Sequence, residues 1–359
     1  MFSDVFLKSF RLLLLPVALV YWMIVFLRNW FYDKNIFKTT SFGLPVICIG
    51  NISVGGTGKS PMVEYLVVNL KDRFRIATLS RGYKRRTRGY SLANENTTAL
   101  DIGDEPMQFH LKFPDVPVAV GEERIVAIPQ LLHDKPDIQA IILDDAFQHR
   151  AIKAGLNIML TDCNNLFTRD FYLPTGDLRD LKSSYKRADI IVVTKCKTDL
   201  ANKEADSIIE EIEPLEKQKV FFTSIQYGQP YHIMQHAVKP LSRDMEVLLV
   251  AGIANPAPLK KMLEECTKTY YMNHYQDHHI FTIDDLKDIK KKFEKIESEN
   301  KIILTTEKDA VRLIKFKDDI SSLPLYVIPI RHNFLFNGAE KFNNTVIDFI
   351  ENFKREGQL

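Results

Sequence analysis

Cysteine is scarce in this chain of 359 residues, which has only four, at positions 48, 163, 196 and 266. No two of them form a Cys-x-x-Cys pair, and no histidine stands at zinc-finger spacing, so the sequence offers neither a disulfide framework nor a zinc module. This usage is typical of a reduced, cytosolic protein. We expect each thiol to serve as a small, buried apolar side chain.

A marked excess of charge is also absent. The chain has 48 Lys and Arg against 46 Asp and Glu, a net charge of +2, which argues against a dedicated nucleic-acid binder. Apolar residues make up 45% of the chain, and its 15 glycines and 16 prolines follow no period. Disordered and collagen-like proteins are therefore excluded, and the length predicts about two domains.

Long apolar runs are missing except for one, at residues 12–27 (LLLLPVALVYWMIVFL). Its 16 residues fall short of the ~20 that cross a bilayer comfortably, and no small-x-small cleavage site of a signal peptide follows. A buried core helix remains an alternative. Basic flanks at Arg11 and Arg28 and the aromatic residues 30–32 favour a helix that spans the membrane or is anchored at its interface. We therefore predict a membrane-associated helix within residues 1–35.

Beyond residue 40, short Val/Ile/Leu runs alternate with amphipathic stretches. This alternation predicts an α/β fold in which a parallel sheet is covered by helices. The expected strands are 45–50, 74–79, 116–120, 140–144, 156–160, 190–194, 220–223, 247–251, 302–305 and 325–328. The expected helices are 61–70, 122–132, 204–212, 258–265, 283–296 and 340–353. Residues 226–245, which are polar and contain Gly and Pro, predict a linker between a core at 36–225 and a smaller α/β domain at 246–359.

A phosphate-binding loop is the strongest motif in the sequence. Residues 53–60 (SVGGTGKS) follow a predicted strand and precede a predicted helix, although the strict pattern has glycine where Ser53 stands. The glycines allow backbone N–H groups to turn toward phosphate, Lys59 would reach the β- and γ-phosphates, and Ser60 would hold Mg²⁺. The residues expected to bind ATP are Ser53, Val54, Gly55, Gly56, Thr57, Gly58, Lys59 and Ser60.

A pair of acids supports this interpretation. Asp144 and Asp145 end a buried-type strand at 140–143, as in a Walker B element, whose carboxylate orients Mg²⁺. Three classes of nucleotide-dependent protein compete. A GTPase is disfavoured because residues 194–197 (TKCK) lack the aspartate of a base-reading motif, and a partitioning-type ATPase because Val54 replaces its signature lysine. A small-molecule or lipid kinase remains, and it requires a base near the γ-phosphate.

Several short motifs follow one another along the chain: GNISVGGTGKSP (50–61), SRGY (80–83), GDEP (103–106), DDAFQH (144–149), PTGDLR (174–179), DHH (277–279) and TEKDA (306–310). In this order they resemble the tetraacyldisaccharide 4′-kinase family. The departures are small: Ser60 stands where threonine is commoner, Ala146 replaces a glycine, and PTGDLRD differs from the usual PAGxLRE. The resemblance extends from the N-terminal apolar segment to about residue 330.

The resemblance implies a P-loop kinase that transfers the γ-phosphate of ATP to the 4′-hydroxyl of tetraacyldisaccharide 1-phosphate in lipid A biosynthesis, with Mg²⁺, at the cytoplasmic face of the inner membrane. Asp104 resembles the catalytic base, Glu105 an additional magnesium-linked acid, and His278 the histidine that pairs with the base. Without the resemblance, GDEP would be a turn or helix start, and of the adjacent His278 and His279 at most one is expected to enter the site.

Basic residues are expected to contact substrate or phosphate. These lower-ranked candidates are Arg81, Arg124, His149 and Arg179. Arg124 and Arg179 lead because arginine binds phosphate oxygens through a forked pair of donors. The expected partners are the lipid substrate and the membrane surface, with no nucleic acid and no obligate protein partner. The alternative function is a membrane-docked P-loop NTPase that acts as a switch or maturation factor.

Overall fold

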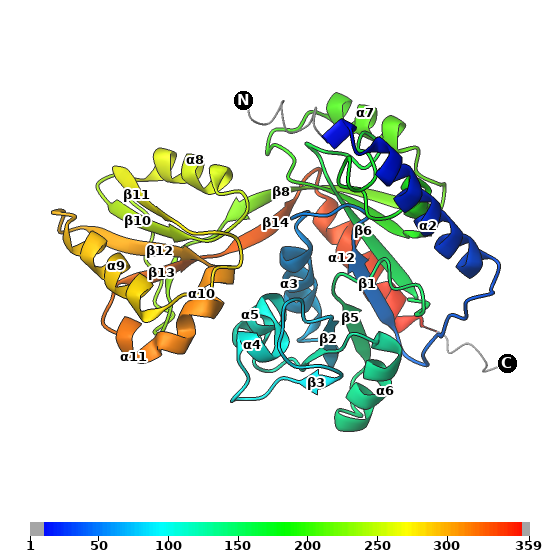
Figure 1. Ribbon diagram of the computed structural model, residues 1–359, viewed down its shortest axis with the longest axis horizontal. Helices are drawn as coiled ribbons and strands as arrows, with labels where there is room; N and C mark the ends of the chain where they lie inside the picture. Colours follow the sequence, from blue (N-terminus) through cyan, green and yellow to red (C-terminus); the bar gives the residue numbers. More distant parts are fainter. Residues whose placement is uncertain (1–10, 354–359) are drawn as a thin grey trace.

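The computed structural model describes residues 11–353, which form two sheets flanked by helices (Figure 1). Residues 1–10 of the predicted N-terminal segment and residues 354–359 lie outside the described part. The larger sheet has nine strands in the order β14-β8-β7-β6-β1-β5-β2-β4-β3, and the smaller has five in the order β11-β10-β12-β13-β9. This mixed α/β architecture confirms the predicted fold class.

The larger sheet is parallel except at its edges, where β14 and β3 run antiparallel to their neighbours. Its strands are β1 (Val46–Gly50), β2 (Ile76–Ser80), β3 (Ser91–Leu92), β4 (Val118–Val120), β5 (Ala140–Leu143), β6 (Leu156–Asp162), β7 (Ile190–Thr194), β8 (Lys219–Tyr227) and β14 (Ile330–Phe334). The central strands β1, β2, β5 and β7 are buried at every position. Helices must therefore cover both faces.

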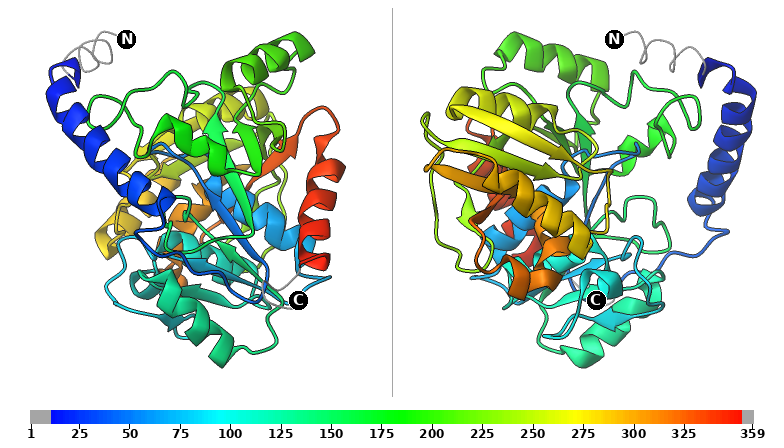
Figure 2. Two further views of the ribbon diagram at one scale, coloured as in Figure 1. Left: turned by 90° about the vertical axis from the view of Figure 1, so that its right-hand side faces the viewer. Right: turned by 60° about the vertical axis from the view of Figure 1, so that its left-hand side comes forward.

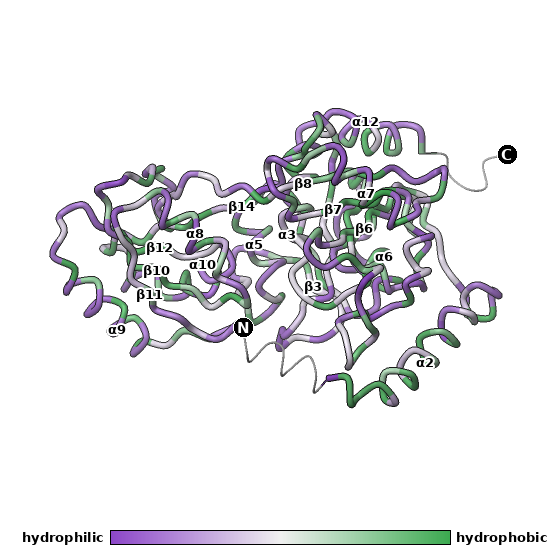
Figure 3. The backbone as a smooth tube through the Cα atoms, turned by 90° about the horizontal axis from the view of Figure 1, so that it is seen from above, coloured by the Kyte–Doolittle hydropathy of each residue, from purple (hydrophilic) through white to green (hydrophobic). Residues whose placement is uncertain are grey.

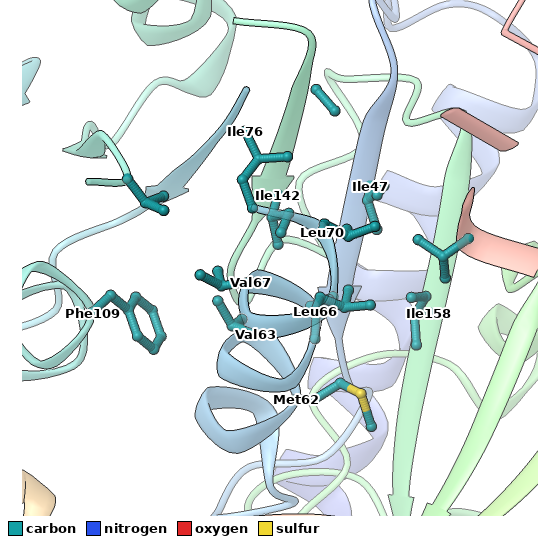
Figure 4. Packing of buried hydrophobic residues seen from close by; sticks show 14 of the residues in the cluster. Ile47, Met62, Val63, Leu66, Val67, Leu70, Ile76, Phe109, Ile142 and Ile158 are labelled. Carbon is teal, nitrogen blue, oxygen red and sulfur yellow. The ribbon is translucent and has the colours of Figure 1, made fainter. Parts of the chain in front are cut away.

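Two sets of helices provide this cover. The helices on this sheet are α3 (Lys59–Leu70), α4 (Ala99–Ile102), α5 (Asp104–Lys112), α6 (Arg124–Asp134), η1 (Lys182–Arg187), α7 (Asn202–Ile212) and α12 (Gly338–Glu351). On one face, Met62 and Leu66 of α3 pack toward Ile47 and Ile158 of the sheet (Figure 4). The other face packs against α6 and α7.

The smaller sheet repeats this layered arrangement. Its strands are β9 (Tyr231–His232), β10 (Glu246–Ala251), β11 (Thr269–His274), β12 (Lys301–Thr306) and β13 (Leu325–Ile328), and its helices are α8 (Ala257–Cys266), α9 (Ile283–Glu294), α10 (Glu307–Leu313), η2 (Ile314–Phe316) and α11 (Lys317–Ile320). Its two faces have separate apolar cores, one with α9 and one with α8.

The chain crosses between the two sheets twice. The chain leaves the larger sheet through β8 and returns to it through β14, which pairs with β8 (Figure 1). The structure therefore differs from the predicted ranges, because β14 and α12 fall within 246–359 but belong to the larger sheet. Part of the range 226–245 is likewise a strand, β9, of the smaller sheet. Only Pro329 separates β13 of the smaller sheet from β14 of the larger sheet. The point at which the chain returns to the larger sheet is therefore not marked by a change in amino-acid composition.

The N-terminal helix α2 (Leu15–Asp33) lies along the outer edge of the larger half (Figure 2). It is apolar over most of its length (Figure 3). Its most apolar stretch of 18 residues has a mean hydropathy of 1.3, and only 11% of that stretch is buried. Leu19 and Ile24 are 65% and 58% exposed, which excludes the alternative of a core helix. The length and exposed apolar surface of α2 suggest association with a membrane.

The cysteines are free, as expected of a reduced protein, in the part of the chain that the structure describes. Cys48 and Cys196 are buried, whereas Cys163 is half-buried and Cys266 is exposed. The expectation of burial is therefore wrong for Cys266, which is the last residue of α8.

Candidate active site

The phosphate-binding loop lies at the carboxyl edge of the larger sheet, between β1 and α3. Gly55 and Gly58 have φ angles of +101° and +85°, which side chains with a Cβ rarely adopt. Apart from the adjoining residues, no atom of the described chain lies within 4 Å of a Cβ built at Gly55 or Gly56, so the loop leaves room for phosphates. The amino end of α3 faces the same space and adds its positive dipole.

Lys59 begins α3 and turns toward the acids of the neighbouring strand. Its Nζ lies 3.8 Å from Oδ1 of Asp145 and 3.4 Å from Oδ1 of Asn51. Burial lowers the pKa of Lys59, while the charge of Asp145 works against that fall. The lysine is thus held at the mouth of the loop, where it can reach phosphate oxygens.

Asp144 and Asp145 follow β5 beside this loop and differ in their surroundings. Burial, followed by repulsion from Asp145, raises the pKa of Asp144 to about 7. Its Oδ2 accepts a bond of 3.4 Å from Ser80, whereas its buried Oδ1 has no hydrogen-bond partner among the described residues. Burial also disfavours the charge of Asp145, but Lys59 and Arg179 hold its pKa below the ordinary value.

This donor set fits Mg²⁺. A cation beside Asp144 would satisfy the unpartnered oxygen and favour the ionised carboxylate. Within residues 11–353 no three His, Cys, Asp or Glu side chains gather in a metal cage. That arrangement agrees with the habit of Mg²⁺, which takes one or two carboxylates and completes its shell with phosphate oxygens and water.

Arg179 lies in the segment after β6 and contacts residues next to the phosphate loop. It is paired with Asp145 and donates to Oδ1 of Asn51 over 2.5 Å. The same segment holds the loop backbone, because the N–H of Val54 donates to the carbonyl of Asp177 over 2.7 Å and Ser53 forms a β-bridge with Leu178. Nη1 and Nη2 of Arg179 are therefore bonded within the protein, whereas its buried Nε has no partner among the described residues. Ser53, where the strict motif has glycine, contacts the same segment.

Asp104 meets His278 at the junction of the two sheets. Asp104 begins α5, and its Oδ2 lies 2.9 Å from Nδ1 of His278 and 2.6 Å from Nη2 of Arg312. Burial disfavours the charge of Asp104, but Arg312 and then His278 hold its pKa below the ordinary value. His278 has a φ of +62°, a conformation that residues other than glycine adopt at a cost and that clusters at functional sites.

Both ring nitrogens of His278 have charged neighbours. Nε2 lies 3.2 Å from Nζ of Lys308, whereas Nδ1 lies 2.9 Å from Oδ2 of Asp104 and 3.1 Å from Nη2 of Arg312. Lys308 also lies 3.6 Å from Glu105 and 3.3 Å from Asp277. Glu105 thus faces a lysine of the second sheet.

The remaining predicted residues line the same region. Arg124 begins α6 and is 3% exposed, and it donates to the carbonyl of Glu122 over 3.2 Å. Burial, with the charges of Arg124, Arg28 and Arg81, lowers the pKa of His149 to about 4, so its ring is neutral. Nε of Arg124 and Nε2 of His149 have no partner within the described chain. Arg81 follows β2 and is exposed.

Helix α2 is bonded to these site segments. Tyr21 donates to the carbonyl of Arg179 over 3.0 Å, Arg28 donates to that of Gln148 over 2.7 Å, and Asn29 donates to Oδ1 of Asp180 over 2.7 Å. The apolar helix is therefore attached beside the site along one face and exposes its other face.

Three residues around the site had no role in the sequence analysis. Arg312 and Lys308 hold Asp104 and His278, and Asn51 links Lys59 to Arg179. Lys308 falls within the motif TEKDA, which could have drawn attention to it, whereas no local pattern marks Arg312. His332 of β14 is a fourth: its Nε2 lies 2.8 Å from the carbonyl oxygen of Gly58.

Comparison with known proteins identifies relatives that match most of the chain. A family model described as tetraacyldisaccharide-1-P 4′-kinase matches residues 10–351. The tetraacyldisaccharide 4′-kinase of Bacteroides thetaiotaomicron is 42% identical, covering 96% of this chain and 95% of its own. That of Flavobacterium johnsoniae is 43% identical, covering 95% and 97%. The crystal structure of LpxK from Aquifex aeolicus in complex with ATP has a TM-score of 0.73 at 28% identity and covers 95% of this chain and 99% of its own.

Proposed function

Because the chain belongs to the tetraacyldisaccharide-1-P 4′-kinase family, we propose that it transfers the γ-phosphate of ATP to the 4′-hydroxyl of tetraacyldisaccharide 1-phosphate in lipid A biosynthesis. One observation supports the proposal beyond the family resemblance: Arg312 and His278 hold the pKa of Asp104 below its ordinary value, and the charge of the next residue, Glu105, acts on Lys59. A carboxylate so placed can act as the base for an acceptor hydroxyl.

Proton transfer begins at Asp104. Oδ2 of Asp104 is bonded to Arg312 and lies 2.9 Å from Nδ1 of His278, which leaves Oδ1 to accept the proton of the 4′-hydroxyl. The hydroxyl oxygen would then form its bond to the γ-phosphorus as the bond from that phosphorus to ADP breaks, and ADP would leave. His278 lies between Asp104, which is next to its Nδ1, and Lys308, which is next to its Nε2, so the ring would orient the carboxylate. A base ionised at neutral pH is ready to accept the proton without a prior ionisation step.

The phosphate loop, Lys59 and Ser60 would bind the nucleotide phosphates, and Asp144, with Asp145 and Glu105 nearby, would hold Mg²⁺. Bound Mg²⁺ supplies positive charge that neutralises the phosphate oxygens. Arg179 positions Asp145 and Asn51, while the unpartnered nitrogens of Arg124 and His149 suit contacts with anionic oxygen. Arg81, which is exposed after β2, would attract an anionic lipid.

The two sheets would contribute different parts of the active site. The larger sheet would bind ATP, and the smaller would contribute His278, Lys308 and Arg312 to the acceptor site. Helix α2 would lie on the cytoplasmic face of the inner membrane, with its bonded face toward the kinase and its exposed apolar face in lipid. The substrate, a lipid with a phosphate headgroup, would then reach Asp104 without leaving the membrane surface.

A transfer assay tests this function against the alternative of a membrane-docked NTPase switch. Purified protein is incubated with ATP labelled in the γ-phosphate and a membrane lipid extract that contains the disaccharide lipid. The kinase predicts label in an organic-soluble phospholipid. Label found solely in inorganic phosphate would support the switch and contradict the kinase. The Lys59→Ala variant, expected to lose both products, controls for contaminating activity.

A further inference from the structure

A buried cluster of charges lies behind the proposed active site. Nζ of Lys112 lies 2.5 Å from Oε2 of Glu64 and 2.5 Å from Oε1 of Glu307. The side chains of both glutamates are 5% exposed and that of Lys112 is 23% exposed. Nothing in the proposed chemistry uses these groups, so their burial requires another explanation.

Each member of the cluster belongs to a different helix. Glu64 lies on α3, Lys112 ends α5, and Glu307 begins α10. The same helices carry parts of the proposed site: α3 begins with Lys59, α5 begins with Asp104, and the carboxyl-terminal turn of α10 carries the Arg312 that bonds to Asp104. The cluster thus joins the nucleotide half, the base and the second sheet at one point.

The secondary bonds of the cluster extend this connection. Gln108, one turn before Lys112 on α5, donates to the other oxygen of Glu64 over 2.7 Å. The other oxygen of Glu307 accepts from the backbone N–H of Ile330, at 3.3 Å, where β14 begins. Apolar packing accompanies these bonds, since Val311 of α10 belongs to the same core as the residues of α3 and α5.

Charge makes Lys112 the essential member. Burial raises the pKa of Glu64 to about 7, and the charge of Glu307 adds to this rise, while Lys112 opposes it. Burial also disfavours the ammonium of Lys112, but the two carboxylates raise its pKa above the ordinary value. Without the lysine, two carboxyl groups would face each other across the junction of α3 and α10 and repel one another when ionised.

We propose that Lys112 is a positioning residue, which clamps α5 between α3 and α10 and so sets the distance from Asp104 to the phosphate bound at Lys59. The clamp acts on the far end of the helix whose first residue is the base. Because misplacement of a reacting group by about 1 Å can cost about 10²-fold in rate, the clamp should control turnover rather than nucleotide affinity. The inference rests on the proposed kinase function.

The test compares three variants of the full chain with the wild type: Lys112→Met, the triple variant Lys112→Met/Glu64→Gln/Glu307→Gln, and Lys71→Met. The last removes a lysine outside the cluster whose side chain is 27% exposed, close to the exposure of Lys112, and which pairs with Asp115 over 2.9 Å; it is the matched control. Melting temperature, ATP affinity, and kcat and KM for lipid phosphorylation are measured for each. The triple variant has no buried charge at the cluster, so it folds even if Lys112→Met alone does not.

We expect Lys112→Met to melt at a lower temperature and to lose about 10²-fold in kcat while its ATP affinity stays within about twofold. The triple variant should regain the melting temperature but remain at least about 10-fold slow, because neutral side chains relieve repulsion without restoring the clamp. Lys71→Met should match the wild type.

Two results would overturn the inference: recovery of kcat together with melting temperature in the triple variant, which would make the cluster merely structural, or a kcat of Lys112→Met within about twofold of the wild type. Failure of the proposed function has a different signature. In that case the wild type itself would transfer no phosphate to lipid.

Discussion

Replacement of Arg312 by methionine should lower both the stability of the protein and its rate of phosphate transfer. The guanidinium donates to Asp104 over 2.6 Å and to Asp309 over 3.2 Å, and its side chain is 6% exposed. Removing one partner of a buried ion pair costs about 3–5 kcal/mol. Asp104 keeps His278, and Asp309 keeps the N–H of Gly252, so we expect the lower end, about 3 kcal/mol.

An exposed ion pair provides the matched control. Arg169 pairs with Glu211, but its side chain is 56% exposed. Arg169→Met should therefore cost no more than about 1 kcal/mol. Free energies of unfolding from urea titration give both values, and the phosphotransfer assay should show a kcat loss of about 10²-fold for Arg312→Met alone, since the base loses its orientation.

The pH dependence of this effect follows from the direction of the shift. Arg312 holds the pKa of Asp104 below its ordinary value, so the stabilisation is fully present above the unfolded pKa, about 3.9, and is lost as pH falls through the folded pKa. The difference between wild type and Arg312→Met should thus be largest at neutral pH and shrink below about pH 4. A loss below about 1 kcal/mol, or one that does not change with pH, would refute the electrostatic account.

Three further predictions concern the base, the metal and the membrane. Asp104→Asn should lower kcat by about 10²–10⁴-fold and leave ATP affinity, measured by calorimetry, nearly unchanged; a turnover close to that of the wild type would remove Asp104 from this role. Asp144→Asn should raise the Mg²⁺ concentration required for half-maximal activity by at least about 10-fold, and an unchanged requirement would contradict its assignment as a ligand. Ile24→Asp on α2 should reduce cosedimentation with anionic lipid vesicles, whereas Val126→Asp, at a site on α6 that is 49% exposed, should not; equal binding by both variants would argue against insertion of α2.

The sequence predicted the buried strands well because parallel strands covered on both faces are continuous Val/Ile/Leu runs. Strands β11 (TYYMNH) and β14 (IRHNF) escaped prediction because they are half-exposed and contain polar residues. The seven-residue helix α10 is too short for its period to be recognised. The return of β14 to the larger sheet depends on pairing with β8, about which the local sequence says nothing.

The site residues likewise fall into two groups, those that the sequence pattern identified and those that only the fold brings together. The phosphate loop and Asp144 are contiguous with the strands that carry them, so their pattern identified them directly. His278 was singled out only through the family resemblance, and the structure brings it to Asp104. Arg312 lies 208 residues from Asp104 in the chain, and no spacing rule spans that separation. Contacts between the two sheets had to come from the fold.

The position of the new phosphate ester tests the central claim most directly. The purified protein is incubated with Mg²⁺-ATP and tetraacyldisaccharide 1-phosphate, and the lipid product is analysed by phosphorus NMR. We predict a second phosphomonoester at the 4′-oxygen, formed by the wild type and lost in Asp104→Asn. A lipid that remains a monophosphate while ATP is hydrolysed, or an ester at another oxygen, would contradict the account.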